Sequence, residues 1–159
     1  MNYWLTKSEP SSFSIDDLKA SKNRTTAWDG VRNFQARNYM REMKKGDQAF
    51  LYHSSCDVPG IAGIVAIAKE AYPDPTAFDP KHHHYDADSD PDNPRWLMVD
   101  VKFVEKIEPV ISLEQLKAHS TGKLQDMIVL KRGNRLSITP VTKSEWTFIT
   151  SSLSSSLRS

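Results

Sequence analysis

The sequence of 159 residues is poor in cysteine: Cys56 is the only one, so no internal disulfide can form. This cysteine usage is typical of a reducing compartment, and we expect a cytoplasmic protein. Long apolar runs are missing as well, because none approaches the length of a membrane span and the first residues lack the basic and apolar segments of a signal peptide. The sequence therefore predicts a soluble protein without membrane contact.

The sequence also has no large excess of positive or negative charge, because it contains 21 basic and 20 acidic residues and its net charge is +1. The composition, 38% hydrophobic and 26% charged, is that of an ordinary globular domain. The charges are nevertheless grouped, with acidic residues at 86–92 and basic ones at 32–45 and 131–135. A neutral chain of this kind can still present a basic face to a polyanion.

No internal repeat and no break in composition divides the chain. We therefore predict one domain over residues 1–153, followed by a serine-rich tail at 154–159, and a monomer. Residues 73–94, rich in proline and aspartate, are predicted to form one long loop.

Helix starts are predicted from capping patterns. A serine or threonine is followed three residues later by Asp, Gln or Glu, between apolar residues, at Ser14, Ser112 and Thr142. A fourth helix is predicted after Asn33, and Gly46 supplies its C-terminal stop. This helix would bury Ala36, Met40 and Met43 and leave a basic stripe of Arg37, Arg41 and Lys44.

Strands are predicted in the segments between these helices. Residues 60–71 are apolar at both parities, which indicates a strand covered on both faces, with Gly60 and Gly63 marking close backbone neighbours. Helices placed among strands without a repeating strand–helix unit predict an α+β fold around a curled sheet or small barrel. The predicted strands are 2–6, 48–53, 60–71, 95–107 and 136–139, the last closed by Pro140.

Metal binding is the first chemistry to weigh, because three histidines, 82–84, precede the acidic segment. A calcium loop would need glycine where Pro91 stands and glutamate where Leu97 stands. A zinc site would need a second ligand cluster, and adjacent histidines point apart on a regular backbone. We therefore expect no metal, and without a phosphate loop or dinucleotide motif we expect no cofactor.

Catalysis finds little support in the sequence. No elbow motif surrounds Ser54, Cys56 has no evident base partner, and the carboxylates Asp16 and Asp17 are explained by helix capping. We predict that the chain is not an enzyme.

Recognition of a flat ligand is better supported. Four features that suit ligand binding lie within six residues. They are the aromatic ring of Trp28, a glycine at position 30 that lets a ligand approach the backbone, the cation of Arg32 and the helix N-terminus at Asn33. Aromatic walls with convergent polar groups suit a nucleobase, and the basic stripe suits phosphates. The alternative is that Trp28 is a core residue and the arginines form a solvated face.

Seven short motifs follow one another along the chain: Tyr3-Trp4-Leu5-x-Lys7-Ser8-Glu9-Pro10, Trp28-x-Gly30-Val31-Arg32-Asn33-x-x-Ala36-Arg37-Asn38, Gly46-Asp47, Tyr52-His53-Ser54, Pro59-Gly60-Ile61-x-Gly63-Ile64, Tyr72-Pro73-Asp74 and Arg135-Leu136-Ser137. In this order they resemble the EVE domain family over essentially the whole chain. The resemblance implies a PUA-like fold, a small β-barrel with peripheral helices, related to ASCH domains and more distantly to YTH readers of methylated adenine. It also implies binding of a modified base flipped out of nucleic acid.

We therefore predict a non-enzymatic domain that binds DNA or RNA through a modified, for example methylated, base. Two alternatives stay open: a nucleic-acid modification or cleavage enzyme acting with a partner, and a pocket for a free small molecule. The predicted ligand-binding residues are Lys7, Ser8, Trp28, Gly30, Val31, Arg32, Asn33, Tyr52, His53, Ser54, Arg135, Leu136 and Ser137. The predicted phosphate contacts are Arg32, Arg37, Arg41, Lys131 and Arg132.

Overall fold

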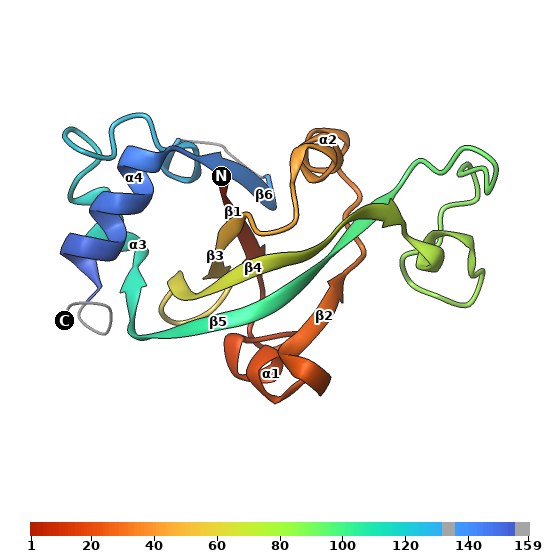
Figure 1. The fold of residues 1–159 in the computed structure, drawn as a ribbon, viewed down its shortest axis with the longest axis horizontal. Coiled ribbons are helices and arrows are strands. Elements are labelled where there is room, and N and C mark those ends of the chain that lie inside the picture. Colours follow the sequence, from red (N-terminus) through yellow and green to blue (C-terminus); the bar gives the residue numbers. More distant parts are fainter. Residues whose placement is uncertain (132–135, 155–159) are drawn as a thin grey trace.

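A computed structural model describes residues 1–131 and 136–154. It contains one six-stranded sheet in the order β2-β5-β4-β3-β1-β6, in which only β1 and β3 pair in parallel. The long strands β4 and β5 lie side by side along the long axis of the molecule, between the end formed by α3 and α4 and the loop that joins the two strands (Figure 1). The strands are β1 (Tyr3–Ser8), β2 (Thr25–Trp28), β3 (Gln48–His53), β4 (Gly60–Pro73), β5 (Leu97–Ser112) and β6 (Ile138–Val141).

Four α-helices cover the two faces of the sheet. One core contains apolar residues of α1 and α2, including Leu18 and Met40, and the other contains Leu116 of α3 and Trp146 of α4. The predicted α+β class is confirmed. The helices are α1 (Ile15–Ala20), α2 (Phe34–Glu42), α3 (Leu113–Lys117) and α4 (Lys143–Phe148), with 3₁₀ turns at Lys22–Arg24, Pro75–Phe78 and Ile128–Leu130 and a π-helical segment at Ile149–Leu153.

All four predicted helix starts are confirmed. Ser14 Oγ accepts a hydrogen bond from the Asp17 amide at 3.1 Å, and Asp17 Oδ2 accepts one from the Ser14 amide at 2.8 Å. The same reciprocal capping box is present at Ser112 and Thr142. Asn33 caps α2 by accepting from the Ala36 amide at 3.0 Å. Local side-chain chemistry therefore fixes where each helix begins.

The prediction for the segment that begins at Gly60 is also confirmed. Residues of β4 enter both cores, among them Val65 on one face and Ile61 on the other. A side chain at Gly60 would lie 2.1 Å from the Ile111 carbonyl oxygen, so only glycine lets β4 and β5 approach this closely.

Several boundaries differ from the prediction. Helix α2 ends at Glu42, four residues before Gly46, because Met43 is already extended. Pro140 lies inside β6 rather than after it, which an edge strand tolerates because a proline removes only an amide hydrogen bond. The C-terminal helical segment continues to Leu153, and Ser154 is only 1% exposed.

Within the described ranges, no helix has the length and apolar composition needed to cross a bilayer.

Candidate functional site

A pocket of about 480 Å³ opens between the end of β1, the strand β2 and the segment that leads into α2. Its volume lies in the range of small-ligand pockets, and both apolar and polar side chains line it. The lining residues are Lys7, Ser8, Phe13, Thr26, Ala27, Trp28, Asp29, Gly30, Val31, Arg32 and Ser137. Of the predicted ligand-binding residues, seven meet here.

Trp28 belongs partly to the core and partly to the pocket. Its ring is half-buried, packs against the core shared by α1 and α2, and makes an edge-on contact with Phe13 at a centroid distance of 6.3 Å. The ring therefore packs against the core and also lines the pocket. The role of Trp28 as a stacking surface stays a prediction.

Another part of the lining comes from the end of β1. The Lys7 amide donates to the Ser137 carbonyl at 2.8 Å, and Ser8 Oγ donates to the Phe13 carbonyl at 2.6 Å. Burial lowers the pKa of Lys7, which is a lining residue and makes no ion pair with the described residues. Its ammonium group carries three hydrogen-bond donors and no acceptor.

Position 30 requires a glycine for two reasons, the conformation of its backbone and the lack of space for a side chain. Its φ is +75°, and a Cβ at this position would lie 2.4 Å from Cε1 of His84. Its amide donates to Asp74 Oδ2 at 2.8 Å. The pocket wall is therefore fastened to the loop that follows β4.

Arg32 completes this attachment, although the sequence predicted a phosphate contact for it. A guanidinium has five N–H donors, and the structure gives Arg32 five hydrogen bonds. Two go to the His84 carbonyl at 3.0 and 2.7 Å, and one to Asp74 Oδ2 at 3.1 Å. The others reach the Val31 carbonyl and Thr76 Oγ1. A phosphate could bind Arg32 only by displacing one of these partners.

Asp74 is the acceptor at the centre of this network. Its side chain is 0% exposed and accepts from the Gly30 amide, from Arg32, and from the amide and hydroxyl of Thr76. Burial alone would raise the pKa of the Asp74 carboxyl, but hydrogen bonds from Thr76, Gly30 and Arg32 outweigh it and hold that pKa below its usual value. Asp74 therefore stays charged and paired.

The structure does not bring every predicted residue to the pocket lining. Tyr52 is 4% exposed and lies in the other core, His53 Nε2 accepts from the Ile15 amide at 3.1 Å, and Asn33 uses its side-chain oxygen to cap α2. Ser54 and Leu136 are half-buried outside the lining. Arg132 and Arg135 lie outside the described residues.

Four lining residues were not predicted: Phe13, Thr26, Ala27 and Asp29. Thr26 and Ala27 belong to β2, a strand that was not predicted because four residues are too few to show a pattern. Asp29 could have been found, because it stands inside the tryptophan–glycine motif.

A second hollow of about 410 Å³, here called the arginine groove, lies along α2, from Phe34 at its start to Arg41 near its end. Arg37 donates to the Arg95 carbonyl at 3.1 Å and lies 4.9 Å over the ring of Phe34, which is 52% exposed. Burial and the neighbouring charges of Arg41 and Arg95 lower the pKa of Arg37. The groove residues are Phe34, Arg37, Arg41, Asp88, Asp90, Asn93, Pro94 and Arg95.

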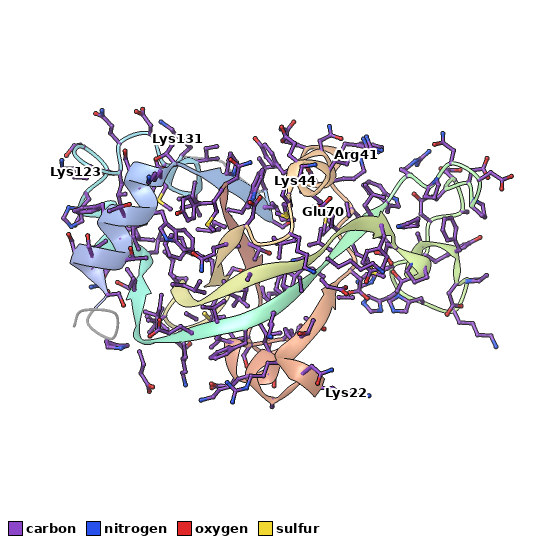
Figure 2. The ribbon with its side chains drawn as sticks, viewed as in Figure 1. Lys22, Arg41, Lys44, Glu70, Lys123 and Lys131 are labelled. Carbon is purple, nitrogen blue, oxygen red and sulfur yellow. The ribbon has the colours of Figure 1, made fainter. Side chains whose placement is uncertain are left out.

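Lys131 belongs to a different part of the surface. Figure 2 shows it beside the end formed by α3 and α4, whereas Arg41 and Lys44 project near α2. Its ammonium group donates to the Gln125 carbonyl at 3.2 Å. The structure thus separates Lys131 from the predicted phosphate contacts on α2.

Known proteins resemble this chain over nearly its whole length. The sequence model of the EVE domain matches residues 2–152. Thymocyte nuclear protein 1 of Gallus gallus is 51% identical over 164 residues, which cover 94% of this chain and 67% of that protein. The human protein of the same name is 49% identical over 165 residues, which cover 94% of this chain and 73% of the relative.

Solved structures agree with these sequence relatives. The crystal structure of human THYN1 in complex with DNA containing 5-methylcytosine matches with a TM-score of 0.89 and 49% identity, over 94% of this chain and 95% of that one. A protein from Pseudomonas syringae matches with a TM-score of 0.87 and 48% identity, over 92% and 96% of the two chains. The family resemblance predicted from the sequence is confirmed.

Proposed function

The chain belongs to the EVE domain family, and on this premise we propose that it is a non-enzymatic domain that binds DNA and recognises a methylated base. The observation that carries the proposal is the pocket wall of Trp28, in a fold shared at 49% identity with a protein crystallised on DNA containing 5-methylcytosine. Methylated cytosine in DNA is accordingly the first candidate ligand.

The chemistry of the pocket supports a base that has left the stack. A flipped base needs an aromatic face to replace its lost neighbours and polar groups that read its edge. Trp28 offers the face, while Lys7, Ser8 and Asp29 carry donors and acceptors around it. The volume of about 480 Å³ accommodates a single nucleotide.

The arginine groove supports a path for the polymer. Val31 and Arg32 line the pocket, and Phe34 and Arg37, a few residues further along the chain, line the groove, so one segment of the chain contributes to both hollows. Arg37, Arg41 and Arg95 bring three guanidinium groups to the groove, against two carboxylates, Asp88 and Asp90. Phosphates next to a flipped base would bind there.

Direct titration tests the proposal. Fluorescence polarisation should measure tighter binding to a duplex with one 5-methylcytosine than to the unmodified duplex, with an affinity that falls as salt rises. A matched RNA carrying the same modification identifies the polymer. Binding of the free methylated nucleoside without salt dependence would instead support the small-molecule alternative, and equal affinity for both duplexes would contradict recognition of the methyl group.

We expect the arginine groove to contribute equally to the binding of modified and unmodified DNA. Arg37→Ala combined with Arg41→Ala should weaken binding to modified and unmodified duplexes by the same factor, because phosphate contacts carry no base information. The slope of log affinity against log salt should become shallower by about 0.9 for each phosphate that the variant no longer neutralises. Lys22→Ala is the control, since Lys22 is exposed on the opposite side of the view in Figure 2. If the double variant kept the affinity and the salt slope of the wild type, these arginines would be exposed to solvent and would not contact phosphates.

We also expect no chemical change in the bound nucleic acid. The described pocket lining holds no histidine or cysteine, and Ser8 Oγ is directed to a backbone carbonyl rather than to a base. Mass spectrometry of a methylated oligonucleotide after long incubation, with and without Mg²⁺ or Zn²⁺, measures this. Product that forms with the purified protein and disappears in Trp28→Ala would establish the enzyme alternative.

The single cysteine favours a reducing compartment such as the cytoplasm, whereas the vertebrate relatives carry the word nuclear in their name.

A further inference from the structure

We propose that His82, His83 and His84 form a binding site for a divalent transition-metal ion, with Zn²⁺ as the representative. Each residue offers one ring nitrogen, and these nitrogens lie within 4.8 Å of one another. Imidazole is a preferred ligand of Zn²⁺, which binds nitrogen at about 2.0–2.1 Å, so small rotations of the three rings would close the gap. Three histidines would leave a fourth position for water.

The local backbone removes the main objection from the sequence, that adjacent histidines diverge. That argument assumes a regular helix or strand, and this segment is neither. The His82 amide donates to the Asp79 carbonyl at 2.9 Å, and the Tyr85 amide donates to the His82 carbonyl at 3.0 Å, which makes two successive turns. The turns gather the rings, with centroids 3.9 to 4.7 Å apart.

The cluster is held by the folded protein rather than by its own sequence alone. Arg32 donates twice to the His84 carbonyl, and the His84 ring lies against Gly30, where even a methyl group would collide. The His84 amide donates to His82 Nδ1 at 3.0 Å. A metal bound through that nitrogen would replace this hydrogen bond with a coordinate bond.

One ring nitrogen already lacks a partner. Nδ1 of His84 is buried and makes no hydrogen bond to any of the described residues. Buried polar atoms are normally satisfied, and leaving one unpaired costs free energy that a metal ion or an ordered partner would recover. This observation is independent of how closely the three rings approach one another.

Calorimetric titration of the whole chain with ZnCl₂ alone, in a buffer that does not chelate zinc, tests the site. We expect one ion per chain, and at least about tenfold weaker binding in His83→Gln, which changes an exposed ligand and leaves the turns intact. His119→Gln is the matched control, because His119 packs on Phe148 away from the cluster. Unchanged binding in His83→Gln, or an equal loss in His119→Gln, would overturn the proposal.

Thermal unfolding distinguishes zinc binding to the folded cluster from zinc binding to three consecutive histidines that does not depend on the fold. The three histidines stay adjacent in the unfolded chain, so binding that does not depend on the fold leaves the unfolding temperature unchanged. Binding to the folded cluster should raise it by about 5 °C or more at saturating zinc, and His83→Gln should remove that rise. Zinc binding without a rise in the unfolding temperature would mean that the fold builds no site.

Discussion

Replacing Trp28 by alanine is expected to abolish discrimination between a methylated and an unmodified duplex. Stacking on one aromatic side chain contributes about 1–3 kcal/mol per base, so affinity for the methylated duplex should fall roughly tenfold to more than a hundredfold. Affinity for the unmodified duplex should fall less, because phosphate contacts in the arginine groove remain. Fluorescence polarisation with both duplexes measures the ratio.

The same substitution tests how much Trp28 contributes to the stability of the core. Truncation of a fully buried tryptophan costs about 3–5 kcal/mol, but this ring is half-buried, so a smaller loss of folding stability is expected. We therefore expect Trp28→Ala to remain folded at the temperature of the binding assay. A variant that unfolds early, or one that still discriminates fully, would contradict the role of Trp28 as the stacking surface.

Two further substitutions make the result specific. Trp28→Phe keeps a smaller aromatic face and should retain part of the discrimination. Phe34→Ala removes an exposed aromatic side chain from the arginine groove and not from the pocket, so it should preserve the ratio between the two duplexes. If Phe34→Ala lost discrimination as well, the base would have to contact the groove.

Features encoded by neighbouring residues were predictable from the sequence. The caps at Ser14, Asn33, Ser112 and Thr142 depend on side chains that bond to amides three residues away, and all four are present. The two-sided burial of β4 follows from its own apolar pattern. Such signals are complete within a few residues, so no knowledge of the fold is needed.

Features that depend on residues far apart in the sequence could not be predicted. Strand β2 consists of four residues and exists because Thr25–Trp28 pairs with β5, which lies far along the chain. Arg32 is satisfied by Asp74 and His84, which lie 42 and 52 residues away. The residues of β3 did not show that Tyr52 would enter the core of α3 and α4 and that His53 would bond to Ile15, both outside the pocket lining.

Replacing Asp74 by alanine is expected to cause the largest loss of stability among the substitutions considered. The side chain is fully buried, and its removal leaves the Gly30 amide and the Thr76 amide without their acceptor and takes one of five hydrogen bonds from Arg32. Breaking a buried ion pair costs roughly 3–5 kcal/mol, a large part of the roughly 5–15 kcal/mol that stabilises a typical domain. Urea and thermal unfolding measure the free energy of unfolding.

Asp16→Ala is the matched control for the removal of an ion pair. Asp16 pairs with Lys106 at 3.0 Å, but its side chain is 65% exposed, so the loss should stay below about 1 kcal/mol. The pH dependence adds a second readout, because the carboxyl of Asp74 has a lowered pKa in the folded protein. Its contribution is therefore complete above the usual value of 3.8 and is lost as pH falls through the lower folded pKa.

The difference in unfolding free energy between the wild type and Asp74→Ala should accordingly be largest near neutral pH and shrink below about pH 4. Equal, small losses in Asp74→Ala and Asp16→Ala would show that the buried network contributes little to stability. A further effect on binding is expected, since Gly30 lines the pocket and its amide loses its bond to the loop after β4. Arg32 loses one of its bonds to that loop and keeps those to His84 and Thr76. Base discrimination should therefore fall in this variant even at temperatures where it stays folded, although Asp74 itself lies outside the pocket lining.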